Sequence, residues 1–181
     1  MRNADCGRRN QDIPPSAFLL PPLVVFDAIA ISPLNASDRF AIVVAQWNRL
    51  VTARLLDGAL AALQAAGVAE ANIDVAWVPG AWELPLTAQR FAQGGRHAAV
   101  ICLGAVIRGE TTHDQHINRA VTTALSQIAL TADIPVLLGV LTCETMEQAV
   151  ARAGGNVGNK GGECAEAAVH MVGLLKNIPP A

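Results

Sequence analysis

Positive charge is scarce in this sequence. Its 181 residues include 13 Lys and Arg against 15 Asp and Glu, so the formal net charge at pH 7 is −2. Proteins that bind nucleic acid or an acidic membrane surface rely on basic patches, and this composition argues against both kinds of partner. The sequence also lacks a run of about 18 apolar residues, the length that a membrane-spanning helix needs.

Cysteine is sparse and is not arranged for metal binding. The four residues, Cys6, Cys102, Cys143 and Cys164, form no Cys-x-x-Cys pair. Cys102 and Cys143 lie inside apolar strand patterns, where cysteine acts as a small hydrophobic residue. We therefore predict neither a zinc site nor a disulfide framework, and we expect a reducing, cytoplasmic compartment.

Aromatic residues make up 4% of the sequence, with four Phe, three Trp and no Tyr. This scarcity draws attention to Trp47 and Trp82, because each follows closely after an expected strand. Packing and ligand contact explain these two residues equally well at this level. Several nucleotide and hydrolase motifs are absent as well, namely a P-loop, a dinucleotide-binding G-x-G-x-x-G motif and a nucleophile elbow.

Residues 1–38 differ in character from the rest of the chain. Arg8 and Arg9 precede an apolar stretch, as in secretion signals, but Pro21, Pro22 and Asp27 interrupt that stretch. We therefore expect residues 1–38 to form a flexible or loosely docked N-terminal extension. Residues 39–181 are expected to form one domain, since this length suffices for a single hydrophobic core.

From residue 39 onward, short apolar runs alternate with amphipathic helical patterns. The runs predict strands at 40–46, 73–78, 98–105 and 134–142, and the helical patterns fall at 50–66, 83–91, 114–132, 144–153 and 163–176. This alternation predicts an α/β fold of right-handed βαβ units, with a parallel sheet covered by helices on both faces. Ligands of such sheets bind outside the carboxyl ends of the strands, which here are followed by turns at 47–49, 79–83, 106–113 and 142–145.

The stretch from Ala98 to His113 is the most informative of these junctions. An apolar strand runs into a polar turn at 108–112, and a helix begins next to His113. The free backbone N–H groups and the dipole of a helix N-terminus favour an anion, most simply a phosphate. A histidine in the first helical turn can transfer protons near neutral pH. Arg108 either contacts the phosphate or pairs with a carboxylate, and His113 with His116 lacks the further ligands that a metal site requires.

A second candidate for phosphate contact is the segment 154–162, which holds five glycines and is expected to be a loop. Lys160 lies within it and Arg152 precedes it, and two cations on a flexible loop suit an anionic ligand. From this segment alone, an ordinary mobile loop is the better explanation.

Five segments, in this order and spacing, resemble the lumazine synthase family of riboflavin biosynthesis. They are VVAQWN (43–48), VPGAWELP (78–85), LGAVIRGETTH (103–113), IPVLLGVLTCET (134–145) and AVARAGGNVGNKG (149–161). The resemblance covers about residues 39–176. It implies a flavodoxin-like three-layer sandwich with a four-stranded parallel sheet flanked by helices on both faces.

The resemblance also implies a reaction and an assembly. The family joins 5-amino-6-(D-ribitylamino)uracil to 3,4-dihydroxy-2-butanone 4-phosphate, which gives 6,7-dimethyl-8-ribityllumazine, phosphate and water. No cofactor or metal is required. Family members form homopentamers, often assembled further into a hollow icosahedral shell, with each active site between neighbouring subunits.

Carried over position by position, the resemblance implies one catalytic residue, His113, which transfers protons. It implies that the substrates are bound by Trp47, Asn48, Ala81, Trp82, Glu83, Val106, Ile107, Gly109, Glu110, Thr111, Leu138, Arg152 and Lys160. Those up to Ile107 contact the pyrimidine and its ribityl chain, and residues 109–111 hold the phosphate. Leu138, Arg152 and Lys160 come from the adjacent subunit, with Arg152 pairing the phosphate.

The sequence departs from the common family pattern at several positions. Trp47 replaces a common Phe and still stacks, whereas Leu138 replaces a frequent Phe and removes an aromatic contact. Glu110 brings a carboxylate close to the phosphate position, which is harmless only where its N–H alone faces the ligand. Gly155 and Asn156 stand where Thr-Lys is frequent, which removes one cation.

Two other functions stay open. One is the related riboflavin synthase of the same fold, which dismutates lumazine, and the other is a non-catalytic shell or lumazine- or flavin-binding protein. The combination of Glu83, His113, Arg152 and Lys160 favours lumazine synthase over both. Relative to shell-forming members of the family, segment 152–160 carries no insertion, so the resemblance favours a 60-subunit shell over a free pentamer. The resemblance also makes riboflavin synthase an expected partner.

Overall fold

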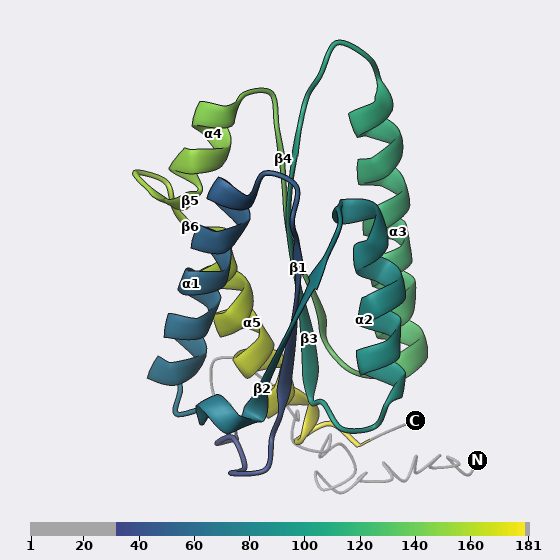
Figure 1. Cartoon of the computed structure of the whole chain (residues 1–181). Coiled ribbons are helices and arrows are strands. Elements are labelled where there is room, and N and C mark those ends of the chain that lie inside the picture. Colours follow the sequence, from purple (N-terminus) through teal and green to yellow (C-terminus); the bar gives the residue numbers. More distant parts are fainter. Residues whose placement is uncertain (1–31, 180–181) are drawn as a thin grey trace, which may run out of the picture.

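The computed structural model describes residues 32–179 as three layers (Figure 1). Four parallel strands form the central sheet in the order β2-β1-β3-β4. Helices α1, α4 and α5 cover one face of this sheet, and α2 and α3 cover the other. The predicted α/β, flavodoxin-like fold with helices on both faces is therefore confirmed.

The bounds of the main elements follow the sequence pattern to within three residues. The strands are β1 (Phe40–Ala45), β2 (Ile73–Val78), β3 (Ala99–Ile107) and β4 (Val136–Cys143), and the helices are α1 (Arg49–Ala65), α2 (Leu84–Gln93), α3 (His113–Ala132), α4 (Met146–Ala151) and α5 (Lys160–Leu175). Two short 3₁₀ turns, η2 (Glu70–Asn72) and η3 (Ala81–Glu83), flank β2. Within the described part of the chain, no helix combines the length and the apolar character needed to cross a membrane.

The two inner strands explain why the sequence shows apolar runs without polar alternation. Phe40, Ile42 and Val44 of β1 pack in the core beneath α1 and α5, whereas Ala41 and Val43 pack in the core beneath α2 and α3. Because both faces of β1 and β3 are covered, every side chain along most of their length must be apolar. Cys102 and Cys143, which were expected to act as small hydrophobic residues, are buried free thiols in β3 and β4.

The expected N-terminal extension lies largely outside the described residues, as does Cys6. Its last part, from Ser32, lies against the end of α5. Lys176 Nζ contacts Asp38 Oδ2 at 2.6 Å, and Ser32 Oγ donates to Asn177 Oδ1 at 2.7 Å. These contacts join the segment that precedes β1 to the C-terminal end of α5.

The glycine-rich segment 154–162 was expected to be a loop, and this expectation is wrong for most of it. Strands β5 (Ala153–Gly155) and β6 (Gly158–Asn159) form an antiparallel hairpin, and α5 begins at Lys160. The helix begins early because the Asn159 side chain caps it: Oδ1 accepts hydrogen bonds from the N–H groups of Gly161 (2.9 Å) and Gly162 (3.2 Å). Glycine also lets α5 cross α1 closely, since a Cβ on Gly161 would collide with the backbone of Leu55.

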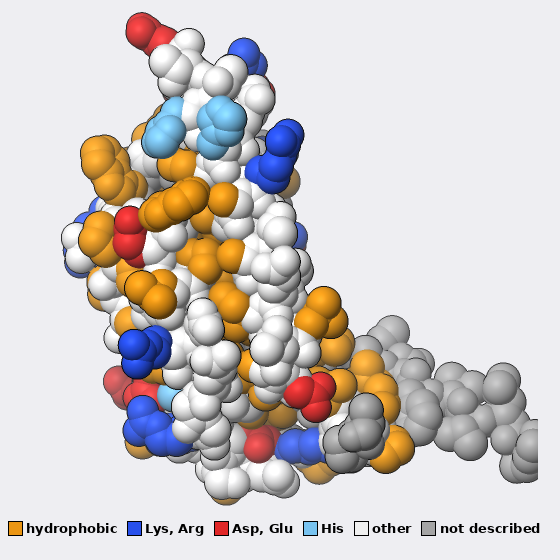
Figure 2. All heavy atoms as spheres, turned by 90° about the vertical axis from the view of Figure 1, so that its right-hand side faces the viewer, with side chains coloured by type: hydrophobic (Ala, Val, Ile, Leu, Met, Phe, Trp, Pro, Cys, Tyr) orange, Lys and Arg blue, Asp and Glu red, His pale blue; other side chains and the backbone are white. Residues whose placement is uncertain are grey.

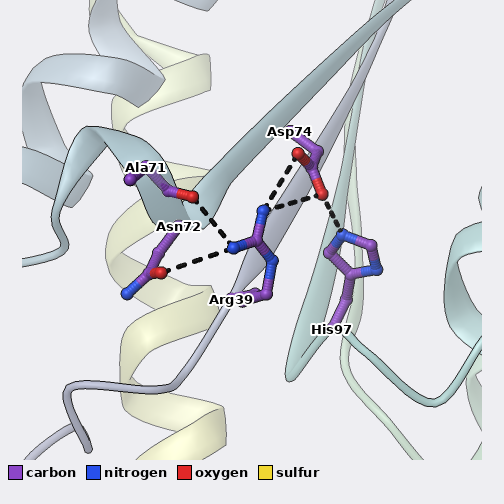
Figure 3. A network of polar contacts seen from close by, with 5 residues as sticks. All are labelled: Arg39, Ala71, Asn72, Asp74 and His97. Carbon is purple, nitrogen blue, oxygen red and sulfur yellow. Dashed lines mark hydrogen bonds and ion pairs between the residues drawn. The ribbon is translucent and has the colours of Figure 1, made fainter.

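A polar network joins the amino ends of the three strands β1, β2 and β3 (Figure 3). Arg39, just before β1, contacts both carboxylate oxygens of Asp74 in β2 at 3.1 and 3.2 Å. His97, just before β3, lies 2.7 Å from Asp74 through Nε2, and its side chain is only 1% exposed. These contacts lower the pKa of Asp74 below its usual value, first through the hydrogen bond from His97 and then through Arg39.

Replacing Gly161 by Ala should separate α1 from α5. The added methyl group meets backbone atoms, which cannot rotate away, so we expect a loss of about 1–3 kcal/mol in the free energy of unfolding. Gly162→Ala is the matched control, since its Cβ would have its nearest neighbour at an ordinary 3.4 Å. That variant should change stability by at most about 1 kcal/mol, in the favourable direction. Chemical denaturation of both variants measures the difference, and equal stability would contradict the close crossing.

The Asp74 network should make stability depend on pH. Because the folded pKa of Asp74 is lowered, its contribution is present above the usual value of 3.8 and is lost as the pH falls below it. At neutral pH we expect Asp74→Asn to lose about 1 kcal/mol, a modest figure because water screens this partly exposed pair. The loss should shrink toward zero in acid. Urea denaturation between neutral and acidic pH checks this, with Asp57→Asn on exposed α1 surface as the control; a pH-independent difference would contradict the assignment.

Candidate functional site

The turns after β1, β2 and β3 meet around one cavity at the carboxyl end of the sheet. Its volume is about 490 Å³, and η3 and the first turn of α3 form its sides. It is lined by Trp47, Asn48, Gly80, Ala81, Trp82, Glu83, Ala105, Val106, Ile107, Gly109, Thr111, His113, Asp114 and Ile117. We call this the first cavity. Its position is where parallel α/β sheets bind their ligands.

Most residues expected in the site lie on the wall of the first cavity. They are Trp47, Asn48, Ala81, Trp82, Glu83, Val106, Ile107, Gly109, Thr111 and His113. Glu110 is an exposed residue of the β3–α3 turn and does not line the cavity. Leu138 lies on the edge strand β4, where it is 42% exposed. The structure therefore brings ten of the fourteen expected residues together and leaves four outside the first cavity, namely Glu110, Leu138, Arg152 and Lys160.

Arg152 and Lys160 line a second cavity of about 350 Å³. The other lining residues come from the end of β4, the β5–β6 hairpin and α5. Lys160 Nζ lies 2.9 Å from Glu163 Oε2, and Arg152 donates to the backbone carbonyl of Gln148 at 3.1 Å. No residue of this second cavity also lines the first.

The two cavities differ in charge. The described residues that line the first cavity include Glu83 and Asp114 but neither Lys nor Arg. Arg108 is close in sequence, yet its guanidinium pairs with Glu144 at 2.8 Å, with side chains 57% and 63% exposed. Of the two roles considered for Arg108, the structure shows the pairing with a carboxylate. The cations of Arg152 and Lys160 belong to the second cavity.

The indole rings of Trp47 and Trp82 lie outside the core and line the first cavity. Trp47 is 73% exposed and Trp82 is 60% exposed, so packing does not explain either residue within one chain. Glu83 is the last residue of η3 and directly precedes α2, and its Oε2 accepts a hydrogen bond from the N–H of Gly80 at 2.9 Å. A carboxylate has several lone-pair sites, so Glu83 keeps acceptor capacity for hydroxyl groups of a ligand.

His113 is the first residue of α3, where the helix leaves backbone N–H groups without intrahelical partners. Gly109 and Thr111 precede it in the turn, so backbone N–H groups and the imidazole lie along one side of the cavity. N–H donors at a helix N-terminus can bind an anion, and an imidazole can transfer a proton near neutral pH. Among residues 32–179, no group of three or more His, Cys, Asp and Glu side chains is arranged to hold a metal ion.

Sequence reasoning missed Gly80, Ala105, Asp114 and Ile117 as lining residues. Helical spacing contains a signal for Ile117, which lies one turn after His113 on the same side of α3. Asp114 directly follows His113, and its Oδ1 is buried without a hydrogen-bond partner among the described residues. Gly80 and Ala105 contribute mainly backbone, which residue-type patterns do not reveal.

Comparison with known families agrees with this geometry. The family model described as 6,7-dimethyl-8-ribityllumazine synthase matches residues 37–176. The match covers most of the chain and contains every residue that lines the two cavities.

Proposed function

Because this chain belongs to the 6,7-dimethyl-8-ribityllumazine synthase family, we propose that it catalyses the condensation of 5-amino-6-(D-ribitylamino)uracil with 3,4-dihydroxy-2-butanone 4-phosphate. The products are 6,7-dimethyl-8-ribityllumazine, phosphate and water. The observation that carries the proposal is the first cavity, where two exposed indoles, a carboxylate, a helix N-terminus and a histidine meet.

One wall of the cavity suits the pyrimidine substrate. The exposed face of Trp47 stacks on the pyrimidine ring, and Trp82 borders the ribityl chain together with Ala81. Glu83 accepts hydrogen bonds from the ribityl hydroxyls through the capacity that Gly80 leaves free. Backbone groups of Val106 and Ile107, at the end of β3, read the polar edge of the ring.

The opposite side suits the phosphate-bearing substrate. The N–H groups from Gly109 to Thr111, with the Thr111 hydroxyl, bind the phosphate beside the positive end of the α3 dipole. Glu110 takes part through its N–H alone, since its side chain does not line the cavity. His113 then transfers protons while the carbonyl forms an imine with the 5-amino group, phosphate leaves and the ring closes.

Charge supports a site that is completed by a second copy of the chain. A phosphate dianion in the first cavity would face Glu83 and Asp114 without a Lys or Arg among the described lining residues. Two unit charges about 4 Å apart interact by roughly 4 kcal/mol at an effective dielectric constant near 20. Arg152 and Lys160, which line the second cavity, are the cations that a neighbouring copy would bring, together with the exposed Leu138.

Exposed apolar side chains on the surface also support association between copies. Hydrophobic side chains gather on the face formed by α2 and α3 (Figure 2), where a groove of about 500 Å³ lies between the two helices. Leu86 and Leu130 are 67% and 85% exposed there. Such exposed apolar surface is typical of an interface. We propose a homopentamer that assembles into an icosahedral shell, with riboflavin synthase as a further partner; mass in solution distinguishes the shell from a free pentamer.

The rate enhancement would arise mainly from positioning. Holding two substrates in a reactive geometry supplies about 7–11 kcal/mol, and general acid–base work by His113 adds about 10²- to 10⁴-fold. No step of this condensation requires a group beyond the residues named above.

The direct test mixes the purified protein with both substrates and follows lumazine absorbance and phosphate release. We expect the two products to appear in equal amounts and only when both substrates are present. Lumazine consumed to give riboflavin would instead identify the riboflavin synthase of the same fold. Binding without any turnover would identify a non-catalytic lumazine- or flavin-binding protein.

The shared site predicts complementation between inactive variants. His113→Ala should slow turnover by about 10²- to 10⁴-fold without abolishing it, because positioning remains. Arg152→Ala should mainly raise the KM of the phosphate substrate. When the two variants are unfolded together and reassembled in equal amounts, about a quarter of the sites should pair an intact His113 with an intact Arg152.

At a concentration of the phosphate substrate well below the KM of the Arg152→Ala variant, activity of the mixed assembly should therefore rise well above that of either variant alone. As a control, each variant is unfolded and reassembled separately. Activity of the mixture that equals the mean of the two would contradict a site shared between chains. Wild-type protein that regains its activity after the same unfolding and reassembly shows that the procedure succeeds.

A further inference from the structure

The turn Trp47-Asn48-Arg49 is fastened to strands on both sides of β1. On the β2 side, the N–H of Trp47 donates to the carbonyl of Pro79 at 3.2 Å. The guanidinium of Arg49 lies 4.4 Å from the ring centre of Trp77 in β2. On the β3 side, Nδ2 of Asn48 donates to the carbonyl of Ala105 at 2.9 Å.

Asn48 occupies a backbone conformation that few residues tolerate. Its φ and ψ are 59° and 42°, in the left-handed region, where Asn is one of the accepted residues. From this position its own carbonyl accepts hydrogen bonds from the N–H groups of Val51 (2.8 Å) and Thr52 (3.1 Å), which starts α1. The same conformation turns the side-chain amide toward β3.

The carbonyl of Ala105 needs the partner that Asn48 supplies. The pairing of β1 with β3 ends at Val44 and Leu103, and Ala105 lies two residues further along β3. With β1 already past its last paired residue, the Asn48 amide takes the place of a strand partner. An amide so engaged is a structural group at the rim of the first cavity.

Gly80 lies against the indole ring of Trp47. A Cβ on Gly80 would lie 3.0 Å from Cδ1 of Trp47 and 3.3 Å from Oε2 of Glu83. The absence of a side chain therefore lets the ring of Trp47 rest against the turn that also holds Glu83. Trp47 is 73% exposed and has no core around its ring. The ring is therefore positioned by its contact with Gly80 and by the backbone of its own turn.

We propose that Asn48 is a positioning residue, which fixes the stacking surface of Trp47 through its hydrogen bond to Ala105, and that it does not bind the substrate through its amide. This inference rests on the proposed function, because it takes Trp47 as the surface on which the pyrimidine ring stacks. It changes the role that the family resemblance implies for Asn48.

Two substitutions isolate the hydrogen bond. Asn48→Asp keeps the shape and the tolerance for the left-handed region, but a carboxylate cannot donate to the Ala105 carbonyl. Asn48→Gly keeps the backbone conformation without any side chain, and it serves if the first variant does not fold. Asn72→Asp is the matched control, since Nδ2 of Asn72 donates to the carbonyl of Ala36 at 2.8 Å at the other end of the sheet.

Steady-state kinetics with the full chain test the proposal as a double-mutant cycle. Asn48→Asp and Asn48→Gly should raise the KM of the pyrimidine substrate about tenfold and leave the KM of the phosphate substrate within about twofold. In a Trp47→Leu background the same changes should add less than about twofold, because Asn48 acts through Trp47. Additive effects, or an equal effect of Asn72→Asp, would overturn the proposal.

A second measurement needs no substrate and separates this inference from the proposed function. In a Trp77→Phe, Trp82→Phe background, the emission of Trp47 should lose steady-state anisotropy on Asn48→Asp and keep it on Asn72→Asp. Unchanged anisotropy on Asn48→Asp overturns the positioning role. If the wild-type protein fails to condense the substrates while Asn48→Asp still lowers the anisotropy of Trp47, the proposed function is refuted and Asn48 remains the group that orders Trp47.

Discussion

The structure depends on the burial of β1 and β3 on both faces. All six residues of β1, from Phe40 to Ala45, are at most 1% exposed, and β1 is paired along both of its edges. A strand in this position has no room for polar side chains, because each buried polar group would need a hydrogen-bond partner. Polar side chains are therefore excluded from β1 and from most of β3, and they gather near the two ends of the sheet, which use them differently.

At the amino end the polar groups bind one another. Asp74 contacts both Arg39 and His97, so its carboxylate oxygens are engaged within the chain. At the carboxyl end, β3 extends beyond its pairing with β1. The side chain of Asn48 donates a hydrogen bond to the carbonyl of Ala105, which no longer faces a residue of β1. The same staggering opens the first cavity. At the amino end, the contacts of Asp74 with Arg39 and His97 join β2 to the segments that lead into β1 and β3.

The sequence predicts the helices and strands well because two-sided burial leaves unbroken apolar runs. It also predicts that Trp47, Trp82 and His113 lie at the carboxyl end of the sheet, because they fall in or next to the turns that follow parallel strands. It fails at 154–162, because the glycines there signal a loop and outweigh the local N-cap signal of Asn159, while the crossing of Gly161 over Leu55 is a tertiary contact. Backbone contributions from Gly80 and Ala105 are hidden for a related reason. The grouping of Arg152 with Lys160, away from His113, also depends on packing that no local pattern contains.

The separation of charge between the two cavities has a cause in the topology. The first cavity is built from turns next to η3 and α3, whereas Arg152 and Lys160 follow β4, whose connection leads to α4 and α5 on the other face. In the described part of the chain, the cavity lined by His113 and the cavity lined by Arg152 and Lys160 therefore have separate linings. This separation supports the proposed site between two copies. The apolar residues exposed on α2 and α3, such as Leu86 and Leu130, offer a surface for the association that the proposed function requires. The high apolar content of the sequence fits the two-sided core of each chain and, in the proposed assembly, the contact between chains.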